Sequence, residues 1–183
     1  RDKPPMPAKC PHLRTARLTM RLLTDDDAEF ILRLVNEPSW IKYIGDRNIH
    51  SVEDAKRYIQ TGPLAMYEQH GYCLNVVERL ADNVPVGMCG LLNRETLEWP
   101  DIGFAFCAEF HGQGFAFEAA KATLKHAQDS LRLTQIAAVT ALDNRPSITL
   151  LNKLGFAFVK QIQFEQQGEA SNLFLKALAL NGR

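Results

Sequence analysis

A turn with two glycines, set between a predicted strand and a predicted helix, constrains this chain more than any other feature. It reads His111-Gly112-Gln113-Gly114-Phe115-Ala116. Glycines let the backbone turn tightly and bring successive N–H groups close to a ligand. Here those groups would lie at a helix N-terminus, where the helix dipole favours an anion. The turn therefore predicts a phosphate or pyrophosphate site, although glycine spacing alone fits a tight turn without a ligand equally well.

Two common phosphate-binding motifs are excluded by the same residues. A P-loop needs Gly-x-x-x-x-Gly-Lys-Ser/Thr, which is absent. A dinucleotide fingerprint needs a final Gly or Ala where Phe117 stands. It should also open a parallel βαβ unit, whereas this turn follows a predicted antiparallel meander.

The hydrophobic periodicity of the chain predicts one α/β domain with a mixed sheet, in the order β-α-α-β-β-β-α-β-α-β-β. Residues 1–13 contain four prolines and are predicted to be an extended arm, and residues 14–183 a single domain. Gly62-Pro63 should interrupt the second helix, and residues 39–44 should form a loop. Strands are expected at residues 17–22, 72–79, 84–92, 101–107, 135–141, 156–164 and 172–178, and helices at 25–37, 51–67, 114–129 and 145–154.

Composition excludes several classes of function. The chain has 21 Lys and Arg against 21 Asp and Glu, so we expect no general attraction to nucleic acid or to an anionic membrane. No apolar run is long enough for a transmembrane helix. The 4 cysteines and 5 histidines are scattered without metal-ligand spacing, so no metal site is expected. A reducing, cytoplasmic setting is the default expectation.

Further motifs stand in a fixed order around the glycine turn. They are Asp101-Ile102-Gly103-Phe104, Glu118-Ala119-Ala120, Asn144-Arg145-Pro146-Ser147 and Asn152-Lys153-Leu154-Gly155-Phe156. Together with the turn, they resemble the GNAT superfamily of N-acetyltransferases over residues 17–178. Segments 17–21, 36–38, 43–45 and 51–55 are similar to the branch that contains the RimJ/RimL-type ribosomal-protein N-terminal acetyltransferases.

The resemblance implies a mostly antiparallel, twisted sheet flanked by helices. Its two parallel strands, 101–107 and 135–141, should splay apart to form an acyl-CoA cleft. Acetyl-CoA would be the co-substrate, and an amine the acceptor, in a monomer or homodimer. Asn144 and Ser147 would contact the CoA arm or thioester, although both also suit helix capping. The implied CoA-binding residues are Phe104, Ala105, Phe106, His111, Gly112, Gln113, Gly114, Phe115, Ala116, Asn144 and Ser147.

Two departures from the family pattern matter. His111 stands where Arg or Gln is usual, and Gln113 where a basic residue is frequent, so the pyrophosphate would depend mainly on backbone N–H groups. Leu151 stands where many relatives carry a Tyr that protonates the leaving thiolate. Ser147 or a water would have to take that role, or the thiolate would leave without help. A CoA-binding or sensor protein with little or no activity is therefore the alternative function.

The sequence offers several candidate residues for the general base and for the acceptor-binding groove. Asp101 is the first candidate for the general base, with Glu165 and Glu169 as alternatives, and each could equally be a structural or surface charge. Trp40 and Tyr43 could wall a substrate groove or fill the core beneath the first two helices. Without an acidic cluster nearby, a peptide N-terminus or an amino-acid-like amine is a better acceptor than a polyamine.

Overall fold

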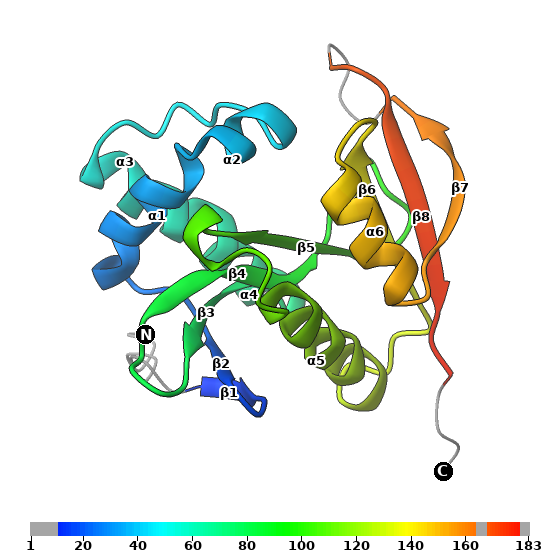
Figure 1. Cartoon of the computed structure of the whole chain (residues 1–183), viewed down its shortest axis with the longest axis horizontal. Coiled ribbons are helices and arrows are strands. Elements are labelled where there is room, and N and C mark those ends of the chain that lie inside the picture. Colours follow the sequence, from blue (N-terminus) through cyan, green and yellow to red (C-terminus); the bar gives the residue numbers. More distant parts are fainter. Residues whose placement is uncertain (1–10, 164–167, 180–183) are drawn as a thin grey trace.

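The computed structural model describes residues 11–163 and 168–179, and within these ranges eight strands form one mixed sheet (Figure 1). The spatial order is β1-β2-β3-β4-β5-β6-β8-β7, and only β5 and β6 are parallel neighbours. The bounds are β1 (Pro11–Arg14), β2 (Leu18–Arg21), β3 (Leu74–Arg79), β4 (Pro85–Leu92), β5 (Asp101–Phe106), β6 (Gln135–Ala141), β7 (Ala157–Ile162) and β8 (Ser171–Ala177). The predicted mixed, mostly antiparallel sheet is confirmed.

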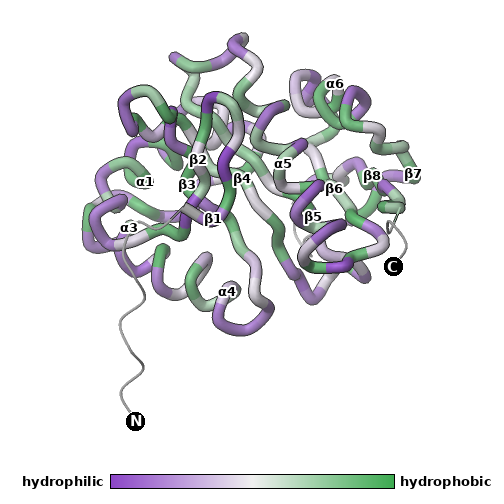
Figure 2. The backbone as a smooth tube through the Cα atoms, turned by 90° about the horizontal axis from the view of Figure 1, so that it is seen from below, coloured by the Kyte–Doolittle hydropathy of each residue, from purple (hydrophilic) through white to green (hydrophobic). Residues whose placement is uncertain are grey.

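Helices cover both faces of the sheet at β1–β5, and the last helix, α6, lies beside β6 (Figure 1). They are α1 (Ala28–Val35), α2 (Pro38–Tyr43), α3 (Val52–Ile59), α4 (Ala65–His70), α5 (Phe115–Asp129) and α6 (Arg145–Lys153). Successive strand residues point to opposite faces. Val77 and Cys89 accordingly pack in the cluster that contains α5, whereas Val76 and Met88 pack with α1 and α3. Along the chain, hydrophobic and hydrophilic stretches alternate as this one-sided burial requires (Figure 2).

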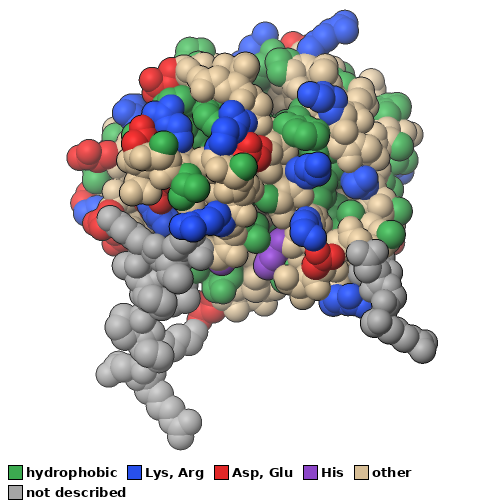
Figure 3. Space-filling model, turned by 60° about the horizontal axis from the view of Figure 1, so that its bottom comes forward, with side chains coloured by type: hydrophobic (Ala, Val, Ile, Leu, Met, Phe, Trp, Pro, Cys, Tyr) green, Lys and Arg blue, Asp and Glu red, His purple; other side chains and the backbone are tan. Residues whose placement is uncertain are grey.

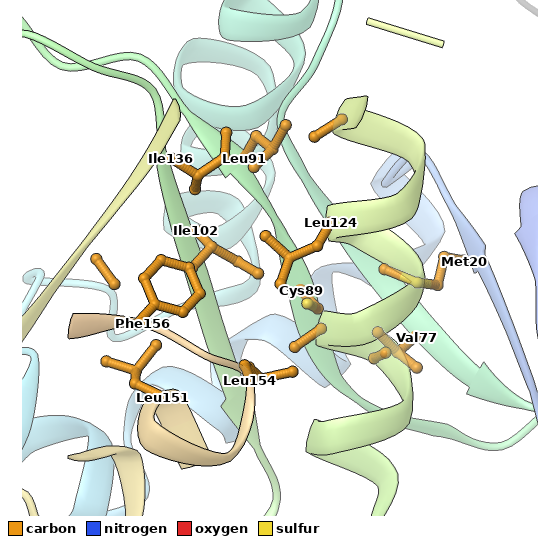
Figure 4. Packing of buried hydrophobic residues seen from close by; sticks show 14 of the residues in the cluster. Met20, Val77, Cys89, Leu91, Ile102, Leu124, Ile136, Leu151, Leu154 and Phe156 are labelled. Carbon is orange, nitrogen blue, oxygen red and sulfur yellow. The ribbon is translucent and has the colours of Figure 1, made fainter. Parts of the chain in front are cut away.

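The core cluster that contains Val77, Cys89 and α5 also joins the two halves of the sheet, β1–β5 and β6–β8. Leu151 and Leu154 of α6, together with Phe156, pack in the same cluster as Ile102 of β5 and Leu124 of α5. Figure 4 shows the Phe156 ring beside Leu151 and near Ile102. These side chains hold α6 against the first half of the sheet although the strands beneath diverge.

Three segments differ from the sequence-based predictions. Residues 11–13 of the predicted arm belong to β1, where Pro11 pairs with Arg21 in β2, while residues 1–10 lie outside the described residues. The predicted loop at 39–44 is mostly α2, because Pro38 has the φ that a first helical turn requires. Gly62-Pro63 does not break its helix. A π-turn at Gln60–Leu64 accommodates the missing N–H of Pro63 and continues the helix into α4.

The surface in Figure 3 carries Lys and Arg interspersed with Asp and Glu, as the balanced composition predicts. No helix in the described ranges is both long and apolar enough to cross a membrane. Among the same residues, no three metal-ligating side chains of His, Cys, Asp or Glu gather at one place.

A buried ion cluster fixes the entry into α1. Both Nη atoms of Arg21 lie 2.9 Å from the carboxylate of Asp27, and its Nε lies 2.6 Å from Glu78 Oε1. Asp27 also accepts the backbone N–H of Thr24 at 2.8 Å. The cluster therefore joins β2 and β3 to the turn that begins α1.

Replacing Arg21 with Met should lower the free energy of unfolding by about 3–5 kcal/mol, because two carboxylates would stay together in a largely buried place without their cation. Urea denaturation at neutral pH measures the effect. The matched control is Lys125→Gln, which removes an exposed ion pair to Asp129 and should cost less than about 0.5 kcal/mol. Equal losses in the two variants would contradict a structural role for the cluster.

Candidate active site

The parallel strands β5 and β6 meet at one point and then separate. Their pairing consists of Asp101 opposite Ala137, whose N–H donates to the carbonyl of Pro100 at 2.9 Å. Each strand remains fully paired on its other side, β5 with β4 and β6 with β8. Figure 1 shows the resulting divergence between β5 and β6. The predicted splay is confirmed, and it leaves one edge of β5 open.

The open edge of β5 presents backbone hydrogen-bonding groups. Cys107 donates its N–H to Val86 in β4, so by the alternation of an antiparallel ladder Ala105 also turns its backbone groups toward β4. Phe104 and Phe106 turn theirs toward the gap. Among the three residues of β5 that were predicted to bind CoA, Ala105 can therefore contact a ligand in the gap only through its side chain. His111 donates its Nε2 proton to the carbonyl of Phe106 at 2.7 Å, which ties the glycine turn to the end of the strand.

The glycine turn forms a cradle of free N–H groups. Gly112 and Gly114 have φ of 78° and 80°, in the left-handed region that favours glycine. From Gly112 to Phe117, no backbone N–H donates to another described residue. These groups precede and begin α5, so its dipole adds to their attraction for an anion.

Arg17 holds the cradle in place from behind, a role that the sequence did not reveal. Its Nη1 donates to the carbonyl of Gln113 at 2.9 Å, and its Nε lies 2.8 Å from Glu118 Oε1. The guanidinium also lies 4.6 Å from the centre of the Phe115 ring. This charge is used within the protein, by a carbonyl and a carboxylate.

Two lysines approach the side chain of Phe117, at the end of the cradle. Lys153 of α6 lines the cleft, with its Nζ 5.0 Å from the centre of the Phe117 ring. Lys121 of α5 approaches the same ring at 6.0 Å. The prediction that the pyrophosphate depends mainly on the backbone N–H groups stays a prediction, with these two lysines as the nearest additional cations on α5 and α6.

A cleft of about 1220 Å³ runs along the open edge of β5 and reaches both the cradle and the N-terminal helices. Asn144 and Ser147 line it at the start of α6. Asn144 also caps the helix, since its Oδ1 accepts the N–H of Ser147 at 3.4 Å. Leu151, one turn further along, is completely buried against the core and supplies no proton (Figure 4).

Asp101 lies at the junction of the two strands. It is fully buried and does not line the cleft, whereas Arg94, whose Nη2 lies 2.8 Å from Asp101 Oδ2, does. Its second oxygen, Oδ1, has no hydrogen-bond partner among the described residues. Burial raises the pKa of Asp101 to about 6, although the Arg94 charge and hydrogen bond oppose the rise. A carboxyl group with such a pKa can exchange a proton near neutral pH.

The other predicted acids have different positions. Glu169 is exposed and lines the cleft, and Glu165 lies outside the described residues. Glu37, which the sequence analysis did not single out, also lines the cleft and accepts the N–H of Ala108 at 3.0 Å. Its position follows from the tertiary packing of the N-terminal helices beside the end of β5.

Trp40 and Tyr43 both line the cleft on the side of α2. Trp40 is only 6% exposed and belongs to the core cluster of α1 and α3, so most of its side chain fills the core. Its buried indole N–H has no partner among the described residues. Tyr43 is half-buried beneath the Nζ of Lys42, 4.9 Å from the centre of its ring. Trp40 thus combines the two roles that the sequence left open.

Comparison with known proteins agrees with this geometry. Residues 17–157 match the acetyltransferase (GNAT) domain. An uncharacterized N-acetyltransferase of Bacillus subtilis, YoaA, is 31% identical over 148 residues, which cover 80% of this chain and 82% of that protein. A GNAT-family acetyltransferase from Bacillus anthracis has a similar structure, with a TM-score of 0.74 and 22% identity over 90% of this chain and 96% of its own. The structure of RimL, a ribosomal-protein acetyltransferase in complex with coenzyme A, is also similar, with a TM-score of 0.77 and 15% sequence identity. The match covers 90% of this chain and 96% of RimL.

A mixed sheet that opens beside a helix N-terminus with free N–H groups defines an acyltransferase of the GNAT class. The chain belongs to this family, as the match over most of its length shows. The resemblance inferred from the glycine turn and its neighbouring motifs is confirmed.

The raised pKa of Asp101 predicts how pH changes stability. Because the folded-state pKa exceeds the unfolded one, the contribution of Asp101 to stability is fully present below about pH 4 and is lost as the pH rises through about 6. Asp101→Asn cannot ionise. Its free energy of unfolding relative to wild type should therefore rise by about 3 kcal/mol between about pH 4 and pH 7.

Urea denaturation at the two pH values measures this difference. Thr123→Val is the control, because it changes a buried polar side chain that does not titrate in this range, and its difference from wild type should not depend on pH. If Asp101→Asn behaved in the same way as this control, burial of an ionisable carboxyl would be contradicted.

Proposed function

We propose that the protein transfers an acetyl group from acetyl-CoA to a primary amine by direct attack in a ternary complex. One observation carries the proposal: free N–H groups from Gly112 to Phe117 adjoin the open edge of β5 in a single cleft. The first feature suits a pyrophosphate and the second an amide-bearing chain. CoA is a ligand that joins these two chemistries, and the structure of RimL, which has a similar fold, contains bound coenzyme A.

The position of the cradle sets the direction of the acyl donor. An arm that leaves the cradle and pairs with Phe106 and then Phe104 advances toward the start of β5. From Phe106 to Asp101 the strand spans about 17 Å, at about 3.3 Å per residue. The thioester would therefore lie in the part of the cleft near Asp101, Arg94 and the N-terminal helices.

The chemistry requires a neutral amine, a polarised thioester and a route for one proton. The amine nitrogen attacks the thioester carbonyl, and the carbon–sulfur bond breaks as the thiolate leaves. Asp101, through a water, accepts the amine proton. Ser147 donates a proton to the thiolate, since Leu151 cannot. Solvent then returns a proton to Ser147 and takes the amine proton from Asp101, so that the products are the acetylated amine and the CoA thiol. Asn144 and Ser147 would contact the CoA arm as proposed from the family motif.

The acceptor amine would enter from the side of Trp40 and Tyr43. A peptide N-terminus, as in RimJ/RimL-type enzymes, and an amino-acid-like amine both fit the chemistry of this entrance. The cysteines within the described ranges, Cys73, Cys89 and Cys107, are free and buried, which suits the cytoplasmic setting that we propose.

Gly112→Ala tests the cradle. An alanine at this positive φ is strained by about 1–2 kcal/mol, and relief of the strain turns the N–H groups away from the ligand. The acetyl-CoA dissociation constant should rise about tenfold, as measured by titration calorimetry. The control is Gly71→Ala, which has a φ of +81° and open space around a Cβ, but lies outside the cleft.

Both alanine variants should lose similar stability, and Gly71→Ala should keep its acetyl-CoA affinity and its rate of CoA release over a panel of amines. Unchanged affinity in Gly112→Ala would contradict the proposed cradle. Binding of acetyl-CoA by the wild type without CoA release for any amine would instead favour a sensor.

Asp101→Asn tests the proposed base. It removes the proton acceptor without changing the size of the side chain, so kcat should fall by about 100-fold or more while the acetyl-CoA dissociation constant is unchanged. Stopped assays of CoA release, with calorimetry alongside, separate the two quantities. Glu169→Gln is the matched control, a carboxylate that lines the cleft but is exposed. Wild-type turnover in Asp101→Asn would eliminate Asp101 as the base.

A further inference from the structure

A group of polar side chains in the cleft has no part in binding the acyl donor. Arg47 comes from the connection between α2 and α3, Tyr58 from α3, and Arg94 from the segment after β4. All three line the same cleft. They come from separate segments of the chain, so no sequence motif predicts that they line one cleft.

The two arginines share the cleft with the Tyr58 phenol and act on it electrostatically. Burial raises the pKa of this phenol, and the positive charges of both Arg47 and Arg94 act in the opposite direction. No hydrogen bond from the phenol hydroxyl to another described residue is present. The group therefore offers a hydroxyl and two guanidinium groups in one region of the cleft.

The charges in this region do not cancel. Arg94 is paired with Asp101 at 2.8 Å, whereas Arg47 is exposed and makes no ion pair within the described ranges. The carboxylates that line the cleft lie elsewhere in the fold. Glu37 bonds to Ala108, beyond the opposite end of β5, and Glu169 belongs to the connection between β7 and β8. One uncompensated positive charge remains.

This charge lies where the acetyl group would arrive. Arg94 is bound to the first residue of β5, and the cradle follows the last one. An acyl donor extended along β5 therefore brings its reactive end toward Arg94. The adjoining wall is apolar and includes Pro63, Met66 and Leu92.

We propose that the acceptor amine carries a carboxylate, which Arg47 and Arg94 bind together with the Tyr58 hydroxyl, as in a small α-amino acid with an apolar side chain. The proposal rests on the proposed acetyl transfer. Guanidinium groups match the planar, two-oxygen geometry of a carboxylate. The apolar wall would accept the side chain. A polyamine would be repelled by the uncompensated charge of Arg47.

The test compares leucine with leucinamide, which lacks the negative charge, in wild type and in Arg47→Gln. Leucine should be acetylated with at least a tenfold higher kcat/KM than the amide in the wild type. Arg47→Gln should remove most of that preference by raising the KM for leucine. The two amines differ in pKa, but this difference is the same for both proteins and cancels when the preferences are compared.

Arg57→Gln is the matched control, because Arg57 is an exposed arginine of α3 that pairs with Asp54 and lies outside the cleft. It should keep the wild-type preference. The acetyl-CoA dissociation constant should be equal in all three proteins, which separates acceptor binding from donor binding. An equal preference in wild type and Arg47→Gln, or a peptide amide as the best acceptor, would overturn the proposal.

A binding measurement separates this inference from the proposed activity. N-acetylleucine and its amide are titrated into the CoA-bound protein by calorimetry, which needs no turnover. Tighter binding of the acid, lost in Arg47→Gln and kept in Arg57→Gln, supports the carboxylate site even if no amine is acetylated, in which case the proposed transfer alone fails. Equal binding of the acid and the amide overturns the site.

Discussion

The single contact between β5 and β6 at Asp101 and Ala137 determines the architecture of this protein. Each strand has its own antiparallel partner, so the two halves of the sheet are stable without further pairing between them. The halves stay together because Leu154 and Phe156 pack with Leu124 in one core cluster. Side-chain packing thus replaces the missing ladder. The backbone groups of β5 that face the gap are left for solvent or a ligand, since a buried unpaired group would be costly.

The junction of β5 and β6 also buries an ionisable carboxyl group, that of Asp101, next to the candidate site. Asp101 is fully buried, and one of its oxygens has no partner within the described ranges. A folded protein rarely keeps such a group unless it is needed, because burial penalises the charged form. Arg94 offsets part of this penalty and at the same time projects into the cleft. The same ion pair therefore connects the stability of the sheet with the chemistry proposed beside it.

Much of the donor side of the site could be predicted from the sequence, because it is built from contiguous residues. The glycine turn, its strand and its helix follow one another, and the cap formed by Asn144 and Ser147 is equally local. Arg17 and Lys153 could not be predicted, because they approach the turn and Phe117 from distant segments. The short helix at Pro38–Tyr43 was missed because six residues carry too little periodicity to be recognised.

The residues proposed to bind the acceptor could not be predicted either, because they also come from distant segments of the chain. Arg47, Tyr58 and Arg94 are brought together by the packing of α3 on β3 and β4, and Arg47 gives no periodic signal in the sequence. The π-turn around Pro63 places residues of that helix along the cleft by a local change in helical pitch. The proposed donor site thus depends on a short motif, whereas the proposed acceptor site depends on how separate elements pack. Substitutions in the N-terminal helices should therefore change acceptor preference while acetyl-CoA binding is kept.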